Sequence, residues 1–164
     1  MTRVWRLLIG VLAGAALLLI LPFLVIVLGV GAAYGLWLRL RFRHRWGPAR
    51  RAVLVYSDSP HWKRLIETTW LPYLRERAVV LNWSERESWA RLHRLEAAVF
   101  RHYAGTREFN PVAIVLSGWR PAEVIRFWQP FRDFRHGRPG PLRQAEARLG
   151  ELLDVSLAGE SSAV

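Results

Sequence analysis

The chain has 164 residues, no cysteine and a formal net charge of +11 at pH 7. The lack of cysteine excludes disulfides, thiol catalysis and cysteine metal sites. The charge does not predict nucleic-acid binding, because residues 1–51 carry eight arginines and no acidic residue, whereas the remainder is close to neutral and contains no recognised nucleic-acid-binding motif.

An apolar run extends from Leu7 to Leu38 and contains no charged side chain. About 20 apolar residues suffice to cross a bilayer core as a helix, so the run is long enough for one crossing and too short for two. Pro22 lies near its centre and predicts a kink or a break. The run therefore predicts either one tilted, kinked transmembrane helix or a re-entrant hairpin that turns at Pro22. A cleaved signal peptide is a third interpretation, disfavoured because its apolar region is only about 7–15 residues long.

Arginines flank the apolar run unequally. Two precede it, Arg3 and Arg6, and six follow it: Arg39, Arg41, Arg43, Arg45, Arg50 and Arg51. By the positive-inside rule, the heavier flank and the domain that follows it lie in the cytoplasm, as at a bacterial inner membrane. We therefore expect a membrane anchor over residues 1–38 and a basic juxtamembrane linker over residues 39–51, whose charge is attracted to anionic lipid.

The rest of the chain predicts one α/β domain over residues 52–153 and a disordered tail over residues 154–164. Short apolar runs predict strands at residues 52–56, 78–82, 112–116 and 123–128. Helical spacing of apolar residues predicts helices at residues 62–70, with a kink or stop before Pro72, and at residues 89–103 and 142–153, with a short helical turn near residues 131–134.

The resulting order is βαβαββα. A crossover helix implies that the first two strands are parallel, and the short connection before the fourth strand implies a hairpin. This order resembles the thioredoxin-like fold over residues 52–153, with a flavodoxin-like or Rossmann-like parallel sheet as the alternative. The resemblance implies a proline, usually cis, before the third strand, and Pro111 stands at that place. It places the redox cysteines of that fold within residues 57–62, where this chain has none, so thioredoxin-type redox activity is not expected.

Three segments resemble a family of uncharacterised bacterial membrane-anchored proteins. They are LNWSER at residues 81–86, REFNP at residues 107–111 and FWQPFRDFRHG at residues 127–137. The resemblance carries no known function to this chain.

Ligand sites in open α/β sheets usually lie beyond the carboxyl ends of the parallel strands. Polar residues follow the first two predicted strands there. The candidate ligand-binding residues are Ser57, Asp58, Ser59, His61, Asn82, Ser84, Glu85 and Asn110. In a thioredoxin-like sheet, Asn110, Arg107 and Glu108 would approach Asp58. In a parallel sheet, Ser117 and Gly118 would do so. Against a ligand role, Ser59 before Pro60 and residues 84–87 have the form of ordinary helix caps.

No catalytic motif accompanies these residues. Ser57, Asp58 and His61 lack the sequence of a nucleophile elbow, the five histidines show no metal-binding spacing, and no phosphate-binding glycine loop follows a strand. We therefore expect no cofactor and no metal.

Five arginines are interleaved with aromatic residues near the C-terminus. The arginines are Arg126, Arg132, Arg135, Arg138 and Arg143, and the aromatic residues are Phe127, Trp128, Phe131 and Phe134. One interpretation is that this stretch docks on lipid headgroups or on an acidic partner, with the aromatic residues as anchors. The other is that the aromatic residues pack in the core and the arginines between them are solvated.

The sequence therefore predicts a membrane-anchored, non-catalytic α/β module that binds a protein partner or acts as a scaffold at the cytoplasmic face. One alternative is a membrane-tethered enzyme or a binder of a small ligand or anion that uses the loops after strands one and two. The other is an anionic-lipid-binding domain.

Overall fold

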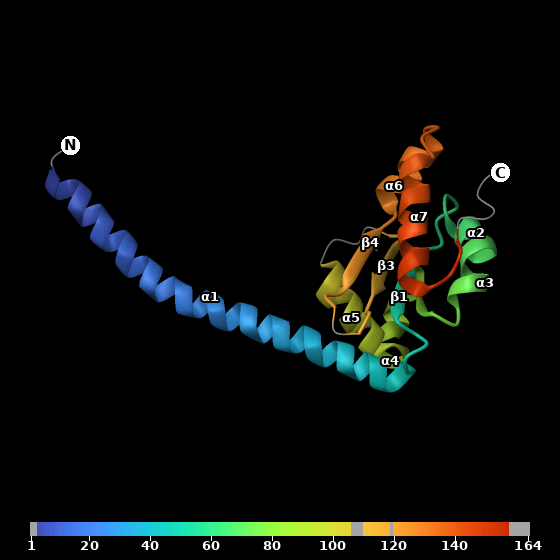
Figure 1. The fold of residues 1–164 in the computed structure, drawn as a ribbon, viewed down its shortest axis with the longest axis horizontal. Helices are drawn as coiled ribbons and strands as arrows, with labels where there is room; N and C mark the ends of the chain where they lie inside the picture. The colour runs from blue at the N-terminus through green and yellow to red at the C-terminus, as the bar shows by residue number, and fades with distance from the viewer. Residues whose placement is uncertain (1–2, 106–109, 119, 158–164) are drawn as a thin grey trace. The chain divides into compact units, whose positions relative to one another are not determined.

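The computed structural model describes residues 3–105, 110–118 and 120–157, and the chain divides into two compact units, Met1–Trp37 and Leu38–Val164. One uninterrupted helix, α1 (Arg3–Trp46), begins in the first unit (Figure 1). Pro22 lies inside α1 without ending it, so the hairpin that turns at Pro22 is wrong. Proline removes one hydrogen bond from the helix ladder, and the rest of the ladder continues on both sides of it.

One helix in the described part of the chain is long and apolar enough to cross a membrane. It is the part of α1 from Leu12 to Trp46, with a mean hydropathy of 2.8 over its most apolar stretch.

The last turns of α1 belong to the second unit. Leu38 and Phe42 are buried, and Trp46 is partly buried against the same cluster of apolar side chains. These residues are spaced by four, which places them on one face of the helix. The predicted linker over residues 39–51 is therefore helical up to Trp46, because an apolar stripe runs between its arginines.

A mixed four-stranded sheet forms the centre of the second unit. Its strands are β1 (Ala52–Tyr56), β2 (Ala78–Asn82), β3 (Val112–Val115) and β4 (Glu123–Arg126), in the order β2-β1-β3-β4. β1 pairs with β2 in parallel and with β3 antiparallel, and β3 and β4 form an antiparallel pair. The fully parallel sheet is wrong, and the predicted hairpin is confirmed. The Asn110–Pro111 peptide bond before β3 is cis.

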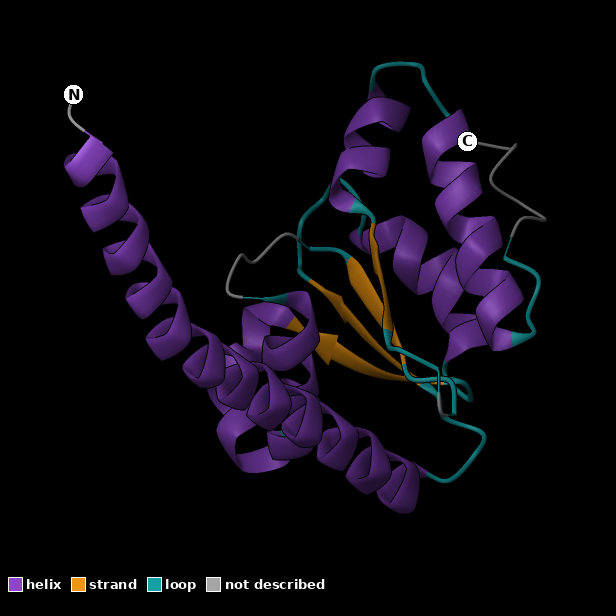
Figure 2. Cartoon of the chain, turned by 60° about the vertical axis from the view of Figure 1, so that its left-hand side comes forward, coloured by secondary structure: helices purple, strands orange, loops and turns teal. Residues whose placement is uncertain are grey.

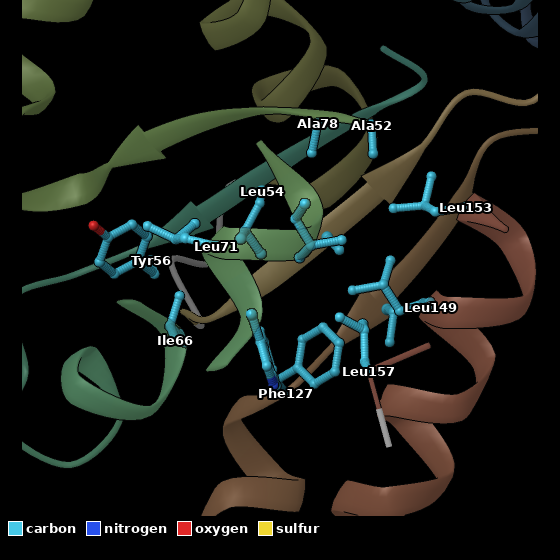
Figure 3. Close-up of a cluster of buried hydrophobic side chains, with 14 of the residues drawn as sticks. Ala52, Leu54, Tyr56, Ile66, Leu71, Ala78, Phe127, Leu149, Leu153 and Leu157 are labelled. Carbon is cyan, nitrogen blue, oxygen red and sulfur yellow. The ribbon is translucent and has the colours of Figure 1, made fainter. Parts of the chain in front are cut away.

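Figure 2 shows helices against one face of the sheet, and Figure 3 shows part of the cluster of buried side chains on that face. Five helical segments contribute side chains to this cluster. They are α2 (Lys63–Leu65), the π-helical turn η1 (Ile66–Trp70), α3 (Leu71–Leu74), α6 (Trp128–Arg135) and α7 (Gly140–Leu153). The first three form one continuous stretch that passes through Pro72 instead of stopping before it. A π-helical turn lies just before the proline. Its hydrogen bonds span five residues instead of four, and this local change of pattern accompanies the proline, which has no N–H to donate.

The other face is covered by the 3-10 helix η2 (Trp83–Ser88), α4 (Trp89–Leu92), α5 (Arg94–Ala104) and the end of α1. The single predicted helix at residues 89–103 is interrupted at His93, whose φ of −133° and ψ of 42° are not helical. Side chains of β1 point alternately to the two faces of the sheet, so the strand contributes to the core on both sides. Leu54 lies in one cluster, and Val53 and Val55 lie in the other.

The predicted tail begins with a packed segment. Asp154 adopts a left-handed conformation at the end of α7 and pairs with Arg51 at 2.6 Å, and Leu157 is buried in the core. The remainder of the predicted tail lies outside the described residues.

Candidate functional site

The carboxyl ends of β1 and β2 meet, as the sequence predicts, and their loops are joined by hydrogen bonds. The register pairs Tyr56 with Asn82. The amide of Asn82 donates to Asp58 Oδ1 at 3.1 Å, and the backbone N–H of Asp58 donates to Ser84 Oγ at 3.1 Å. Three of the predicted ligand-binding residues are therefore in direct contact.

Lys63, the only lysine of the chain, completes this network. Its Nζ lies 2.7 Å from Asp58 Oδ1 and 4.0 Å from Glu67 Oε1, and Glu67 accepts a hydrogen bond of 3.0 Å from the hydroxyl of Tyr56. We call the group of Tyr56, Asp58, Lys63, Glu67, Asn82 and Ser84 the strand-end network. Sequence reasoning missed Lys63, although a lone lysine at the start of the helix that follows Asp58 is a signal that could have been used.

The electrostatics of the network follow from these contacts. Lys63 and then Asn82 lower the pKa of Asp58 by donating to its carboxylate, and Asp58 in turn raises the pKa of Lys63. Burial, followed by the hydrogen bond to Glu67, raises the pKa of Tyr56 to about 12. The ammonium and the carboxylate are thus held in their charged forms and the phenol in its neutral form.

The capping prediction for Ser84 is wrong. Asn82 caps η2, since its Oδ1 accepts from the backbone N–H of Ser84 at 3.0 Å. The hydroxyl of Ser84 is used instead to connect the two loops. Ser59 has a local role, because its carbonyl accepts from Lys63 N–H at 3.0 Å and its Oγ from His61 N–H at 3.4 Å.

The remaining candidates lie around the network and differ in exposure. Glu85 is exposed, and its charge contributes to raising the pKa values of Tyr56 and Lys63. The ring of His61, also exposed, lies edge-on to Trp62.

Two further candidates lie where β1 ends and β3 begins. The antiparallel pairing ends with Val55 opposite Val112, so Ser57 and Asn110 each lie two residues beyond the last pair. Asn110 is buried, and its Oδ1 has no hydrogen-bond partner within the described residues, whereas Ser57 is partly exposed. Arg107 and Glu108, expected at the same edge, lie outside the described residues.

A pocket of about 390 Å³ lies next to the network. Its lining is Trp83, Arg86, Trp89, Ala90, Phe100, Arg101 and Gly105. We call it the aromatic pocket. The rings of Trp83, Trp89 and Phe100 lie 5.4 to 5.8 Å from one another, and the guanidinium of Arg86 lies 5.5 Å from the ring of Trp83.

The pocket and the network share a framework. The indole N–H of Trp89 donates to the carbonyl of Asn82 at 3.1 Å, so the residue that binds Asp58 also positions the pocket floor. Trp89 is buried, but Trp83 is only partly buried and lines the pocket, because the tight 3-10 turn sets it at the edge of the core.

The arginine-rich stretch near the C-terminus packs through its aromatic residues. Phe127 and Phe131 are buried, so these two cannot act as membrane anchors. Arg126 donates to the carbonyl of Ala104 at 3.1 Å, and Arg138 pairs with Asp133 at 2.9 Å.

Three other arginines of the stretch, Arg132, Arg135 and Arg143, are exposed. The guanidinium of Arg132 lies 5.0 Å from the ring of Trp128. The geometry therefore favours core-packing aromatics with solvated arginines between them.

The described residues contain no group of three or more His, Asp or Glu side chains that could hold a metal ion. Comparison of the chain with protein-family models, curated proteins and solved structures found no match.

Proposed function

We propose that this protein is a membrane-anchored, non-catalytic binding module, whose α/β domain holds a protein partner at the cytoplasmic face. The anchor is the apolar part of α1, which is long enough to cross a bilayer. The arginines that follow it support the cytoplasmic placement of the domain, because basic residues are retained on that side.

The domain is in this proposal a thioredoxin-like fold without redox cysteines. The strand order β2-β1-β3-β4, with β3 antiparallel to its neighbours, supports this assignment. The region that carries the redox cysteines in that fold here holds Asp58, whose carboxylate is bound by Lys63 and Asn82.

The aromatic pocket is the single observation that carries the binding function. Tryptophan and arginine are enriched among the residues that contribute most to protein interfaces, and here two tryptophans, a phenylalanine and two arginines line one cavity. Arg86 and Arg101 form no ion pair within the described residues. The matching partner is a peptide segment with an apolar or aromatic side chain next to an acidic one.

The strand-end network serves as the framework of this surface. Asp58, Lys63, Asn82 and Ser84 direct their polar atoms at one another, and Asn82 also holds Trp89. Because bonded groups of this kind are not directed at a ligand, the geometry favours a positioning role for the network over a reactive one.

The test is capture of partners from detergent-solubilised native membranes, using tagged full-length protein. Proteins captured by the wild type are compared by quantitative mass spectrometry with those captured by Arg86→Glu/Arg101→Glu. The control is Arg64→Glu/Arg75→Glu, which changes two exposed arginines of other elements by the same charge. Trp83→Ala provides a second, uncharged variant of the pocket.

We expect at least one protein to be depleted about tenfold or more by both pocket variants and to be retained by the control. Capture that the pocket variants leave unchanged would refute the pocket. Release of the full-length protein from membranes by alkaline carbonate would refute the anchor, and digestion of the domain by protease added outside intact cells would refute the cytoplasmic placement.

A further inference from the structure

A second groove, lined mostly by basic side chains, lies between the end of α1 and the α4–α5 segment. Its volume is about 680 Å³. Its lining is Arg41, His44, Arg45, Arg91, Leu92, Arg94 and Leu95, all within the second unit. We call it the basic groove. It contains four arginines and one histidine, and no acidic residue is part of the lining.

Helix geometry explains how α1 contributes to the groove. Arg41, His44 and Arg45 are spaced by three and four residues, so they share one face of the helix. The adjoining stripe of α1, which includes Phe42, is buried against the domain. Packing of that stripe places the arginine face beside α4 and α5.

The interruption at His93 supplies the opposite wall. Arg91 belongs to α4 and Arg94 begins α5, and the non-helical His93 between them lets the two arginines come from different helices. The indole N–H of Trp46 donates to Glu96 Oε1 at 2.6 Å, which holds the end of α1 against α5. Two arginine clusters about 50 residues apart in the sequence therefore face one groove.

Three arginines of the groove, Arg45, Arg91 and Arg94, have little acidic compensation within the described residues. Glu96 reaches the groove at one point, with Arg45 Nε 3.5 Å from Glu96 Oε1, but this carboxylate is buried and already accepts from Trp46. Arg91 and Arg94 are exposed and form no ion pair within the residues that the structure describes. Like charges held together in this way repel one another, and a bound anion would relieve the repulsion.

We propose that the basic groove binds the phosphate-bearing headgroup of an anionic phospholipid. Arg45 lies a short distance after the apolar run of α1 in the sequence, so this side of the groove follows the proposed anchor directly, where anionic headgroups attract basic side chains.

Leu92 favours a lipid over a free phosphate. Its side chain is 63% exposed at the groove, where it can contact the apolar part of a lipid but gives a water-soluble phosphate nothing to bind. The proposal rests on the membrane anchoring proposed above and adds a defined lipid site to it. It differs from non-specific attraction by the basic segment, because it requires Arg91 and Arg94, which lie far from that segment in the sequence.

The test measures lipid binding by full-length protein in an uncharged detergent. Dioctanoyl phosphatidylglycerol, dioctanoyl phosphatidylcholine and inorganic phosphate are titrated in separate calorimetric experiments. The variant is Arg91→Gln/Arg94→Gln, and the matched control is Arg64→Gln/Arg75→Gln, which removes two exposed arginines elsewhere. Arg91→Lys/Arg94→Lys keeps the charge.

We expect the wild type and the control to bind phosphatidylglycerol at least tenfold more tightly than phosphatidylcholine or phosphate. Removing both arginines should weaken phosphatidylglycerol binding by about tenfold or more, and the lysine variant should retain most of it. If the glutamine double variant loses its cooperative thermal transition, the single variants Arg91→Gln and Arg94→Gln replace it, with the same expected direction.

Several outcomes would overturn the lipid site. Equal affinity for the two lipids, or equal losses in the variant and the control, would exclude selective binding in the groove. Displacement of the lipid by phosphate at similar concentrations would make it a general anion site. A larger loss in Arg132→Gln/Arg135→Gln would move lipid binding to the other arginine-rich stretch. Carbonate extraction tests the anchor separately, so failure of one proposal does not imply failure of the other.

Discussion

The indole N–H of Trp70 donates to Glu146 Oε1 at 2.9 Å, and both side chains are fully buried. This bond connects the π turn of the first crossover to α7 within one core cluster. Trp46 and Glu96 form a similar pair on the opposite face of the sheet. In both pairs the second carboxylate oxygen is buried without a hydrogen-bond partner in the described part of the chain.

The buried pair of Trp70 and Glu146 predicts a pH dependence of stability. Burial raises the pKa of the Glu146 carboxyl. A group whose pKa is raised by folding contributes stability below its unfolded pKa, which is 4.5 for this carboxyl, and this contribution is lost as the pH rises through the folded pKa. We expect Glu146→Gln, which keeps the acceptor for Trp70, to gain stability relative to the wild type as the pH rises from 4 to 8.

The measurement is thermal unfolding of the full-length protein in detergent at several pH values, followed by circular dichroism. The difference in melting temperature between the variant and the wild type should grow with pH. A difference that stays constant from pH 4 to pH 8 would show that Glu146 does not titrate in this range.

Alanine substitutions at two neighbouring positions near the end of α1 should differ strongly in their effect on stability. Phe42 is 1% exposed and Leu40, two residues earlier on the same helix, is 51% exposed. Phe42→Ala should lower the free energy of unfolding by about 3–5 kcal/mol, because it opens a cavity in the core. Leu40→Ala should change it by no more than about 0.5 kcal/mol. Denaturant unfolding measures both values, and equal effects would place residues 39–46 outside the domain core.

The strand-end network predicts a specific change in one carboxyl group. Lys63→Met should raise the pKa of Asp58 toward its ordinary value, because Lys63 is the main cause of its lowered pKa. The stability linked to a lowered pKa is present above the unfolded pKa and is lost as the pH falls through the folded pKa. The variant should therefore lose less stability than the wild type on acidification.

Carbon-13 labelling of aspartate provides the measurement, because the chain has only three aspartates. Asp154, whose pKa is lowered by Arg51, serves as the internal control. Its titration curve should be the same in the variant and in the wild type. An unchanged Asp58 titration would show that Lys63 does not bind this carboxylate in solution.

The end of α7 predicts opposite effects for two glycines of the same helix. A Cβ at Gly150 would lie 2.5 Å from the backbone oxygen of Val155, whereas a Cβ at Gly140 would have no atom within 4 Å. Gly150→Ala should cost about 1–3 kcal/mol of stability, because the chain after α7 must shift. Gly140→Ala should be neutral or stabilising by up to about 1 kcal/mol. Thermal unfolding of both variants checks this, and a neutral Gly150→Ala would show that the segment after α7 is not packed.

The sequence was informative where local chemistry leaves few alternatives. A continuous apolar run such as residues 52–56 must be covered on both faces, which predicts a central strand. The short connection between β3 and β4 leaves no room for a crossover helix, so the hairpin could be predicted. The carboxyl ends of parallel β1 and β2 bring Asp58 and Asn82 together, and this part of the candidate site followed from strand order alone.

Some features had a signal in the sequence that was not used. Leu38, Phe42 and Trp46 recur at helical spacing within the arginine-rich segment, which identifies a buried face in what was predicted to be a linker. Leu157 was assigned to a disordered tail. The left-handed conformation of Asp154 ends α7 and turns the chain, and Leu157 is then buried in the core.

The sequence by itself determined the uncharged run within α1, the first three strands and the hairpin, because each follows from the polarity and spacing of neighbouring residues, whereas the predicted fourth strand at residues 123–128 ends at Arg126 and Trp128 begins α6. Only the tertiary structure decided that Lys63 binds Asp58, that Trp83 lines a pocket, and that Arg91 and Arg94 face Arg41. These relationships depend on how helices pack across the two faces of the sheet, and packing joins residues whose separation in the chain carries no information about their distance in space.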